Sequence, residues 1–257
     1  MKKNEKLAAV RQFYPNAIST DDGVSRLISY IKEQLSMQPE QVMLADSICS
    51  DDVNAIQYPE RAREFLGPFK LGGLDGYPFV GPTGMGAYAH HVPDNGVILI
   101  YYGPHIGVSK EGVLGKIHRH GQKDNSGCCG AALGALGALQ KGDIKKEKPS
   151  RSDFQMDTIK QIFLKSDKRI LDVDEKMQIH EATEVMYEAI DKRIRKLVQK
   201  QIIEGDIHFK HVILVGGIHI NGDKDMGSFT SVKRFDLYSK DAPSSEWTNL
   251  LGTCVAV

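Results

Sequence analysis

The sequence predicts an α/β fold in which a mainly parallel β-sheet is flanked by helices. Continuous apolar runs at 97–102 and 211–220, rich in β-branched residues, have the composition of strands buried on both faces. Amphipathic helical patterns at 20–36 and 177–203 alternate with these runs along the chain. Helices that alternate with apolar strands are typical of a sheet whose strands run mostly parallel.

The overall composition is that of an ordinary globular protein. The chain has 257 residues, of which 41% are hydrophobic and 26% charged. Its 33 basic and 33 acidic residues give a formal net charge of zero, which argues against a nucleic-acid partner. The N-terminus lacks the apolar core of a secretory signal, and no apolar run is long enough for a transmembrane helix. We therefore expect a cytoplasmic protein without a membrane partner, folded as a single α/β domain over residues 1–257.

The N-terminal part of the chain predicts one helix followed by one buried strand. Residues 20–36 space apolar side chains three and four positions apart, and Thr20 or Asp21 can cap the helix. Residues 41–48 are mostly apolar and predict a short strand that ends at Cys49.

Glycine dominates the middle of the chain, within a core predicted at about 40–140. Sixteen of the 25 glycines lie between Gly67 and Gly134, and residues 66–96 are expected to be mostly loop. Because glycine costs backbone entropy on folding, this density indicates tight turns or close backbone approach around a site. The residues 130–140 then predict a helix of small side chains that packs closely on the sheet.

The C-terminal part, about 150–257, predicts a long helix and two strands. A charged loop at 141–153 precedes it, and residues 177–203 form the clearest helix of the sequence. Residues 211–220 predict a buried strand, whereas 228–238 alternate like a half-exposed one. The apolar stripe of the helix consists of Ala182, Val185, Met186, Ala189, Ile190, Ile194, Leu197 and Val198.

Two cysteines and a histidine stand where α/β proteins build their sites. Cys49 ends one predicted strand and His105 follows another, and sites form beyond the carboxyl ends of such strands. Cys129 begins a predicted helix, whose dipole favours a thiolate. Two sulfurs and one nitrogen suit a tetrahedral Zn²⁺ whose fourth position is open to water. The spacing alone also allows a buried, purely structural role for each cysteine.

Longer motifs surround these three residues. The stretch "CSDD" follows the first strand, "GPHIG" the second, and "CCGAALGAL" opens the helix. In addition, "LGGLDGYPFVGPTGMGAYAHHVPDNG" stands at 71–96 and "HRHGQ" at 118–122. Over about 40–140 the chain resembles the β-carbonic anhydrases, and most closely their divergent branch, the limiting-CO2-inducible protein B/C family. The resemblance implies a β-carbonic anhydrase-like fold and the zinc-dependent, reversible hydration of CO2 to bicarbonate.

The resemblance also implies roles for individual residues. Cys49, His105 and Cys129 match the family's zinc ligands, and Cys129 is favoured over Cys128 because it directly precedes Gly-Ala, as in the family motif. Asp51 matches the family's aspartate, which either pairs with an arginine or moves onto the zinc as a fourth ligand.

The partner of Asp51 departs from the pattern of ordinary β-carbonic anhydrases. Those enzymes carry an arginine two residues after the aspartate, where this chain has Val53. We therefore expect the arginine to come from elsewhere, with Arg119 as the first choice and Arg61 and Arg63 as the next.

Contacts with substrate are expected in the glycine-rich region. Tyr88 and Gln122 can orient bicarbonate by hydrogen bonding, and Phe79, Val80 and Tyr88 are candidates for an apolar CO2 pocket. Cys254, in the apolar C-terminal tail, is given no role. Further histidines can serve as alternative ligands or carry protons, namely His90, His91, His118 and His120.

Three functional hypotheses follow from these residues. The first is a carbonic anhydrase, for which the resemblance implies CO2 and bicarbonate as substrates and a homodimer with sites near the subunit interface. The second is a catalytically silent zinc protein of the same fold that acts as a binding or scaffold partner in inorganic-carbon handling. The third is a metal-free hydrolase with Cys129 as nucleophile and His105 as base, which leaves Cys49 without a task.

Overall fold

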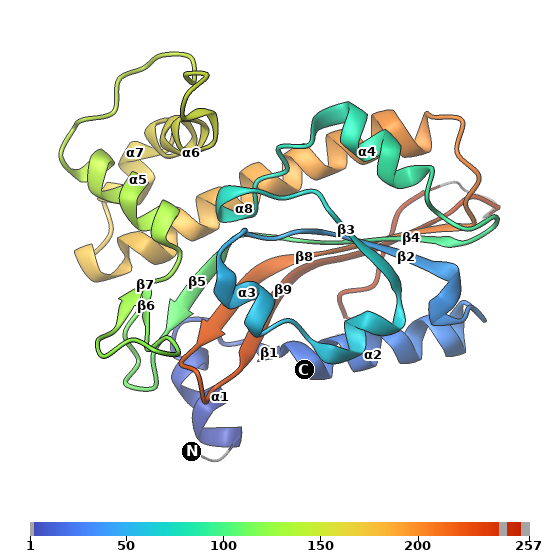
Figure 1. The fold of residues 1–257 in the computed structure, drawn as a ribbon, viewed down its shortest axis with the longest axis horizontal. Coiled ribbons are helices and arrows are strands. Elements are labelled where there is room, and N and C mark those ends of the chain that lie inside the picture. Colours follow the sequence, from blue (N-terminus) through green and yellow to red (C-terminus); the bar gives the residue numbers. More distant parts are fainter. Residues whose placement is uncertain (1–2, 242–245, 253–257) are drawn as a thin grey trace.

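The computed structural model describes residues 3–241 and 246–252, so Cys254 lies outside the described residues. The chain has the predicted α/β fold, built on a mixed, mostly parallel sheet of eight strands (Figure 1). In spatial order the main path is β1 (Ile18–Ser19), β9 (Ser228–Ser239), β8 (His211–Gly222), β4 (Val97–Tyr102), β2 (Val42–Ser47) and β3 (Leu66–Lys70). Two further strands complete the sheet: β5 (His105–Val108) pairs with β8, and β10 (Thr248–Asn249) pairs with β9.

The parallel part of the sheet contains the strands that lead to the candidate site. β2 runs parallel to β3 and β4, and β8 runs parallel to β4 and β5. β9 is antiparallel to β1, β8 and β10 and closes the sheet on the other side. A separate antiparallel pair, β6 (Lys116–Ile117) and β7 (Ser126–Gly127), lies within the glycine-rich insertion after β5.

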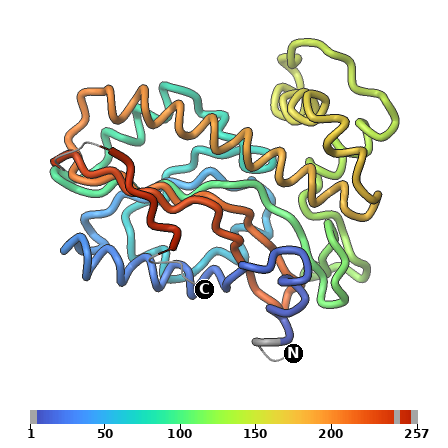
Figure 2. The backbone as a smooth tube through the Cα atoms, turned by 180° about the vertical axis from the view of Figure 1, so that it is seen from behind, coloured from blue at the N-terminus to red at the C-terminus, as the bar shows by residue number. Residues whose placement is uncertain are grey.

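Helices cover both faces of the sheet. Figures 1 and 2 show α8 (Gln178–Val198) and α4 (Gly81–Ala89) over one face and α2 (Thr20–Gln34) along the other. α5 (Gly130–Gln140), α6 (Phe154–Leu164) and α7 (Asp167–Leu171) gather at one end of α8, while α1 (Lys3–Arg11) lies near the N-terminus and α3 (Asp52–Ile56) follows β2. Within the part of the chain that the structure describes, no helix is long and apolar enough to cross a membrane.

Periodicity located the elements that pack on the sheet. The stripe predicted for the long helix is buried in α8 except at the half-buried Ala189, and Ala182, Met186, Ile190 and Ile194 are fully inaccessible to solvent. Burying each of the larger side chains stabilises the fold by about 1.5–3 kcal/mol, so the stripe fixes which face of α8 meets the sheet. A π-helical turn, Gln199–Ile203, continues α8 to the predicted end of the helix.

The prediction that 66–96 is mostly loop was wrong in part. The segment contains the edge strand β3 and the helix α4, whose sequence GPTGMGAYA has three glycines and a proline. Glycine lowers helix propensity, but Met85 and Tyr88 of α4 are fully buried, and this packing outweighs the local preference. The sequence also did not predict α1, α6 or α7.

Gly103 lets the chain pass closely beside β8 on its way from β4 to β5. β4 and β5 share one register with β8, because Tyr102 pairs with Gly216 and His105 with His219. A Cβ atom at residue 103 would lie 1.7 Å from the carbonyl oxygen of Gly217, so no other residue fits there. The position of His105 therefore depends on this glycine.

Replacing Gly103 should disrupt the fold at the beginning of β5. Gly103→Ala is expected to lower the free energy of unfolding by at least about 3 kcal/mol, because the methyl group meets rigid backbone. Urea unfolding followed by circular dichroism would measure this. Gly137→Ala in α5 is the matched control: nothing lies within 4 Å of its Cβ position, and alanine should leave stability equal or higher. Equal stability of the two variants would contradict the assigned role of Gly103.

Candidate metal centre

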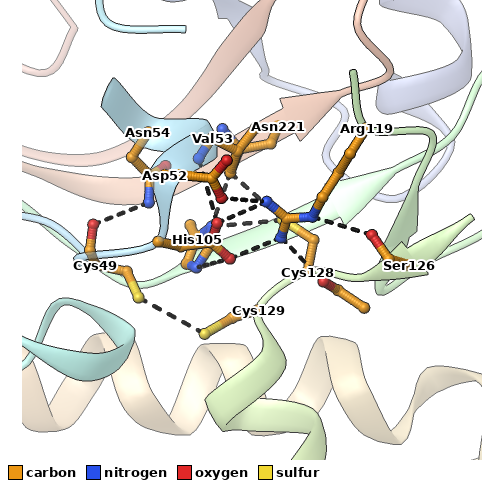
Figure 3. A network of polar contacts seen from close by, with 12 residues as sticks. Cys49, Asp52, Val53, Asn54, His105, Arg119, Ser126, Cys128, Cys129 and Asn221 are labelled. Atoms are coloured by element: carbon orange, nitrogen blue, oxygen red, sulfur yellow. Dashed lines mark hydrogen bonds and ion pairs between the residues drawn. The ribbon is translucent and has the colours of Figure 1, made fainter. Parts of the chain in front are cut away.

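Three buried side chains from three elements meet at the carboxyl ends of the parallel strands. Cys49 follows β2, His105 begins β5, and Cys129 precedes the first turn of α5 (Figure 3). The two sulfur atoms lie 3.8 Å apart, and one donor atom from each residue lies within 4.8 Å of the others. None of the three side chains is more than 5% exposed. Together they form a group that can hold a metal ion.

The hydrogen bonding of His105 leaves one ring nitrogen free for a metal. Its Nδ1 lies 2.8 Å from Oδ1 of Asn221. Its Nε2 is buried and has no hydrogen-bond partner among the described residues. An unpaired nitrogen inside a protein costs about 1–3 kcal/mol unless a ligand satisfies it. Two cysteine sulfurs and this nitrogen are the donors that Zn²⁺ binds, so the residues fit a zinc ion.

Both thiols resist ionisation in the metal-free protein. A hydrogen bond with Cys129 and burial raise the pKa of Cys49 above its ordinary value. The contact with Cys49 lowers the pKa of Cys129, but burial and the charge of Asp75 raise it by more. The pKa of Cys129 therefore also lies above its ordinary value. Thiols held in the neutral form are poor nucleophiles, which argues against the metal-free hydrolase. A divalent cation would instead displace their protons.

Cys128 occupies a different place from its neighbour. Its sulfur lies 3.6 Å from Nδ1 of His105, on the ring edge that faces Asn221. A second possible metal-binding group joins Cys128 and His105 with Asp51, but it contains one sulfur instead of two. The sulfur of Cys129 contacts that of Cys49, and this arrangement favours Cys129 as the zinc ligand.

Asp51 and Arg119 form a two-pronged ion pair at the edge of the site. Nη1 of Arg119 lies 2.7 Å from Oδ1 of Asp51, and Nη2 lies 2.8 Å from Oδ2. Arg119 also donates from Nε to Ser126 Oγ and from Nη2 to the Gly127 carbonyl, which hold it in place. Arg61 instead pairs with Glu64, and both Arg61 and Arg63 are exposed on a separate 3₁₀ turn.

The ion pair keeps Asp51 charged and close to the metal-binding group. Burial raises the pKa of Asp51, but the hydrogen bonds from Arg119 and the charge of His105 outweigh it and bring that pKa to about 2. Oδ2 of Asp51 lies 3.9 Å from Nε2 of His105. The Asp51 side chain also accepts a hydrogen bond from the Val53 backbone and caps α3. The residue is thus anchored on two sides.

The site opens into a cleft of about 890 Å³ whose lining includes Cys49, Asp51, Arg119 and Cys129. Gln122 lies on this cleft, as do His118 and His120 from the glycine-rich insertion. His90 and His91 do not line it; they lie exposed at the end of α4.

The structure does not place Tyr88 and Phe79 at the cleft, which corrects the predicted substrate contacts. The hydroxyl of Tyr88 donates to the carbonyl oxygens of Met43 and Leu99, so the side chain joins α4 to β2 and β4 inside the core. Phe79 packs in an aromatic row with Tyr77 and Phe154. Val80, beside it, packs against the main core instead of lining the cleft.

Two further residues of the site escaped the sequence analysis. The backbone N–H of Asp75 donates to the sulfur of Cys49 at 3.1 Å, and its own carboxylate is fully buried. Burial raises the pKa of Asp75 to about 7. Asn221, which contacts His105, stands just after the apolar run of β8. Its only signal in the sequence was a polar residue at the carboxyl end of a buried strand.

Comparisons with known proteins agree with this geometry. Residues 17–239 match the family described as limiting CO2-inducible proteins B/C β-carbonic anhydrases. The crystal structure of PtLCIB4, described as a homolog of the limiting CO2-inducible protein LCIB, is 28% identical over 95% of this chain and 98% of that chain, with a TM-score of 0.80. The structure of LCIB itself is 17% identical over 93% and 95%, with a TM-score of 0.68, a likeness of fold. A comparison with curated protein sequences gave no match.

The Asp51–Arg119 pair should make stability depend on pH in a defined window. The folded pKa of about 2 lies below the ordinary value of 3.8, so the pair stabilises the fold above about pH 4 and loses its effect as pH falls through 2. Arg119→Ala should therefore lower the free energy of unfolding of the metal-free protein by about 2 kcal/mol at pH 6, and the deficit should shrink toward pH 2. Chemical denaturation across this range would measure it.

Arg61→Ala is the control, because its partner Glu64 lies on the surface. It should cost at most about 1 kcal/mol. A deficit of Arg119→Ala that stays constant from pH 6 to pH 2 would show that the ion pair does not stabilise the charged form of Asp51.

Proposed function

The chain belongs to the family of limiting CO2-inducible proteins B/C, described as β-carbonic anhydrases, and from this premise we propose that it hydrates CO2 reversibly to bicarbonate with zinc as cofactor. The observation that carries the proposal is the buried group of Cys49, His105 and Cys129. These residues would hold the zinc with three ligands and leave the fourth tetrahedral position open, the coordination of a catalytic site.

Zinc bound there would supply a Lewis acid that makes a water molecule nucleophilic near neutral pH. The chain's own residues would orient that water. Asp51, with a pKa of about 2, remains a carboxylate that would accept a hydrogen bond from it. Arg119 fixes the direction of the carboxylate with two parallel hydrogen bonds.

The cleft provides the route for substrate and proton. Leu74 and Ile117 contribute apolar side chains to its lining, against which CO2 can lie in place of the core residues Tyr88 and Phe79. Gln122, which also lines the cleft, can donate a hydrogen bond to bicarbonate. His118 and His120, on either side of Arg119, line the cleft and can pass the released proton to buffer.

A catalytically silent zinc protein that serves as a scaffold in inorganic-carbon handling is the second candidate. The observation that favours it is the distance of 3.9 Å between Oδ2 of Asp51 and Nε2 of His105. From there a modest movement would make Asp51 a fourth ligand and close the site. The two hydrogen bonds from Arg119 oppose that movement, so we favour the open, catalytic arrangement.

We further propose that the protein forms a homodimer, with the cleft beside the subunit interface. Ile56, which lines the cleft, is 70% exposed and would be covered if a second copy packed there. Sedimentation analysis would determine the state of association.

The adjacent cysteines offer a matched test of the proposal. Cys129→Ala removes a proposed ligand and should reduce zinc from about one per chain to near zero and CO2 hydration to the buffer rate. Cys128→Ala removes an equally buried sulfur that is not a proposed ligand, and it should keep both zinc and most of the activity. Stopped-flow CO2 hydration on protein of measured zinc content gives both values.

The outcomes separate the two candidate functions. Full zinc without hydration at pH 7 or above pH 8 would refute the carbonic anhydrase and leave the scaffold protein. Hydration that survives Cys129→Ala but not Cys128→Ala would overturn the ligand assignment.

A further inference from the structure

A chain of side-chain amides links the candidate metal ligand His105 to a backbone carbonyl at the end of β8. Nε2 of Gln57 donates to the carbonyl oxygen of Gly222 at 2.9 Å. Nδ2 of Asn221 donates to Oε1 of Gln57 at 3.1 Å. Oδ1 of Asn221 then lies 2.8 Å from Nδ1 of His105. Asn221 is fully buried, so no solvent competes for its contact with His105, whereas Gln57 is half-buried and lines the cleft.

Every group in this chain has its direction set by the group before it. The Gly222 carbonyl can only accept, so Gln57 must present its NH2 group to it and its oxygen to Asn221. That oxygen can only accept as well, so Asn221 must present its own NH2 group to Gln57. The remaining atom, Oδ1 of Asn221, is an acceptor, and it faces Nδ1 of His105. Nδ1 must therefore carry the ring proton.

We infer that the Gly222 carbonyl fixes the tautomer of His105 through Gln57 and Asn221, which are positioning residues for the metal ligand. With the proton on Nδ1, the lone pair stands on Nε2, the buried nitrogen that has no partner among the described residues. This is the nitrogen nearest to Asp51, at 3.9 Å. The inference deepens the proposed zinc site and rests on that function for its purpose.

Neighbouring groups support this direction. The thiol of Cys128 lies 3.7 Å from Oδ1 of Asn221, where it donates a second, weaker hydrogen bond to the same acceptor. Gln57 is itself held by its backbone, because Ser228 Oγ donates to its carbonyl at 3.0 Å. The amide of Asn221 also adds no charge beside two cysteines that become thiolates when they bind zinc, whereas a carboxylate in its place would add one.

The tautomer is measurable without metal and without catalysis. In reduced, metal-free protein labelled with ¹⁵N-histidine, two-bond proton–nitrogen correlation spectra distinguish the two neutral tautomers of imidazole. Burial lowers the pKa of His105, but its contacts with Cys128 and Cys49 raise it well above the ordinary value, so the spectra are recorded at a pH high enough to leave the ring neutral. The wild type should show His105 protonated on Nδ1. Gln57→Leu does not alter any atom that touches His105, yet it frees the Asn221 amide to turn over, so the other tautomer should appear. Asn221→Ala should give a mixture, and Asn221→Asp, which retains an acceptor, should restore the wild-type form.

Zinc affinity provides the second readout, by competition with a chromophoric chelator. Asn221→Ala should weaken binding by about 10–100-fold, and Gln57→Leu should weaken it less. Asn54→Ala is the matched control for the tautomer, because it removes a buried amide that donates to the Cys49 carbonyl instead of contacting His105. Its His105 spectrum should equal that of the wild type.

Two results would overturn the inference: a wild-type His105 protonated on Nε2, or a Gln57→Leu spectrum unchanged from wild type. Neither depends on CO2 hydration. A protein with the expected tautomers but no CO2 hydration would refute the proposed function alone. An active enzyme with the other tautomer would refute only the inference that Gln57 and Asn221 fix the tautomer of His105.

Discussion

The constraint on which this site depends is that a buried polar atom must find a partner. Among the described residues, four of the eight buried and unpartnered side-chain atoms lie near the metal centre: Nε2 of His105, both carboxylate oxygens of Asp75 and Oδ1 of Asn54. The other four belong to Tyr14, Arg193, His219 and Asp236. At the site itself the Arg119 guanidinium is satisfied more than once, by Asp51 and by the Gly127 carbonyl. Beside this ion pair the unpaired Nε2 of His105 is available to a ligand.

The end of β8 holds two parts of this site in position. Asn221 orients His105, and the carboxylate of Asp223, two residues later, accepts hydrogen bonds from the backbone N–H groups of His118 and Lys110. His118 directly precedes Arg119, so one strand end positions both the candidate metal ligand and the loop that carries the partner of Asp51. The long separation in sequence between these residues is bridged by the parallel pairing of β5 with β8.

The sequence could predict what depends on local pattern and on position in an element. Apolar periodicity located α2, α8, β4 and β8, and the carboxyl ends of two strands pointed to Cys49 and His105. It did not reveal Gln57, and it gave only a position for Asn221, because a neutral amide does not indicate a particular chemistry and their contact joins positions 164 residues apart. The prediction for Tyr88 was based on the opposite kind of evidence, a local pattern. Tyr88 lies in a glycine-rich segment of the kind that often surrounds a site, but packing against the sheet makes this segment the helix α4 and buries Tyr88 in the core.

Charge balance explains why the site requires a distant arginine. A zinc ion with two cysteine thiolates is neutral, and the His105 ligand must be neutral to bind. Asp51 would then add an uncompensated negative charge at a partly buried position, which is unfavourable unless a cation pairs with it. Val53 stands where ordinary β-carbonic anhydrases carry that cation, so Arg119 must be supplied from the insertion between His105 and Cys129. The insertion lengthens the spacing between His105 and Cys129, and it carries Arg119, whose positive charge pairs with Asp51.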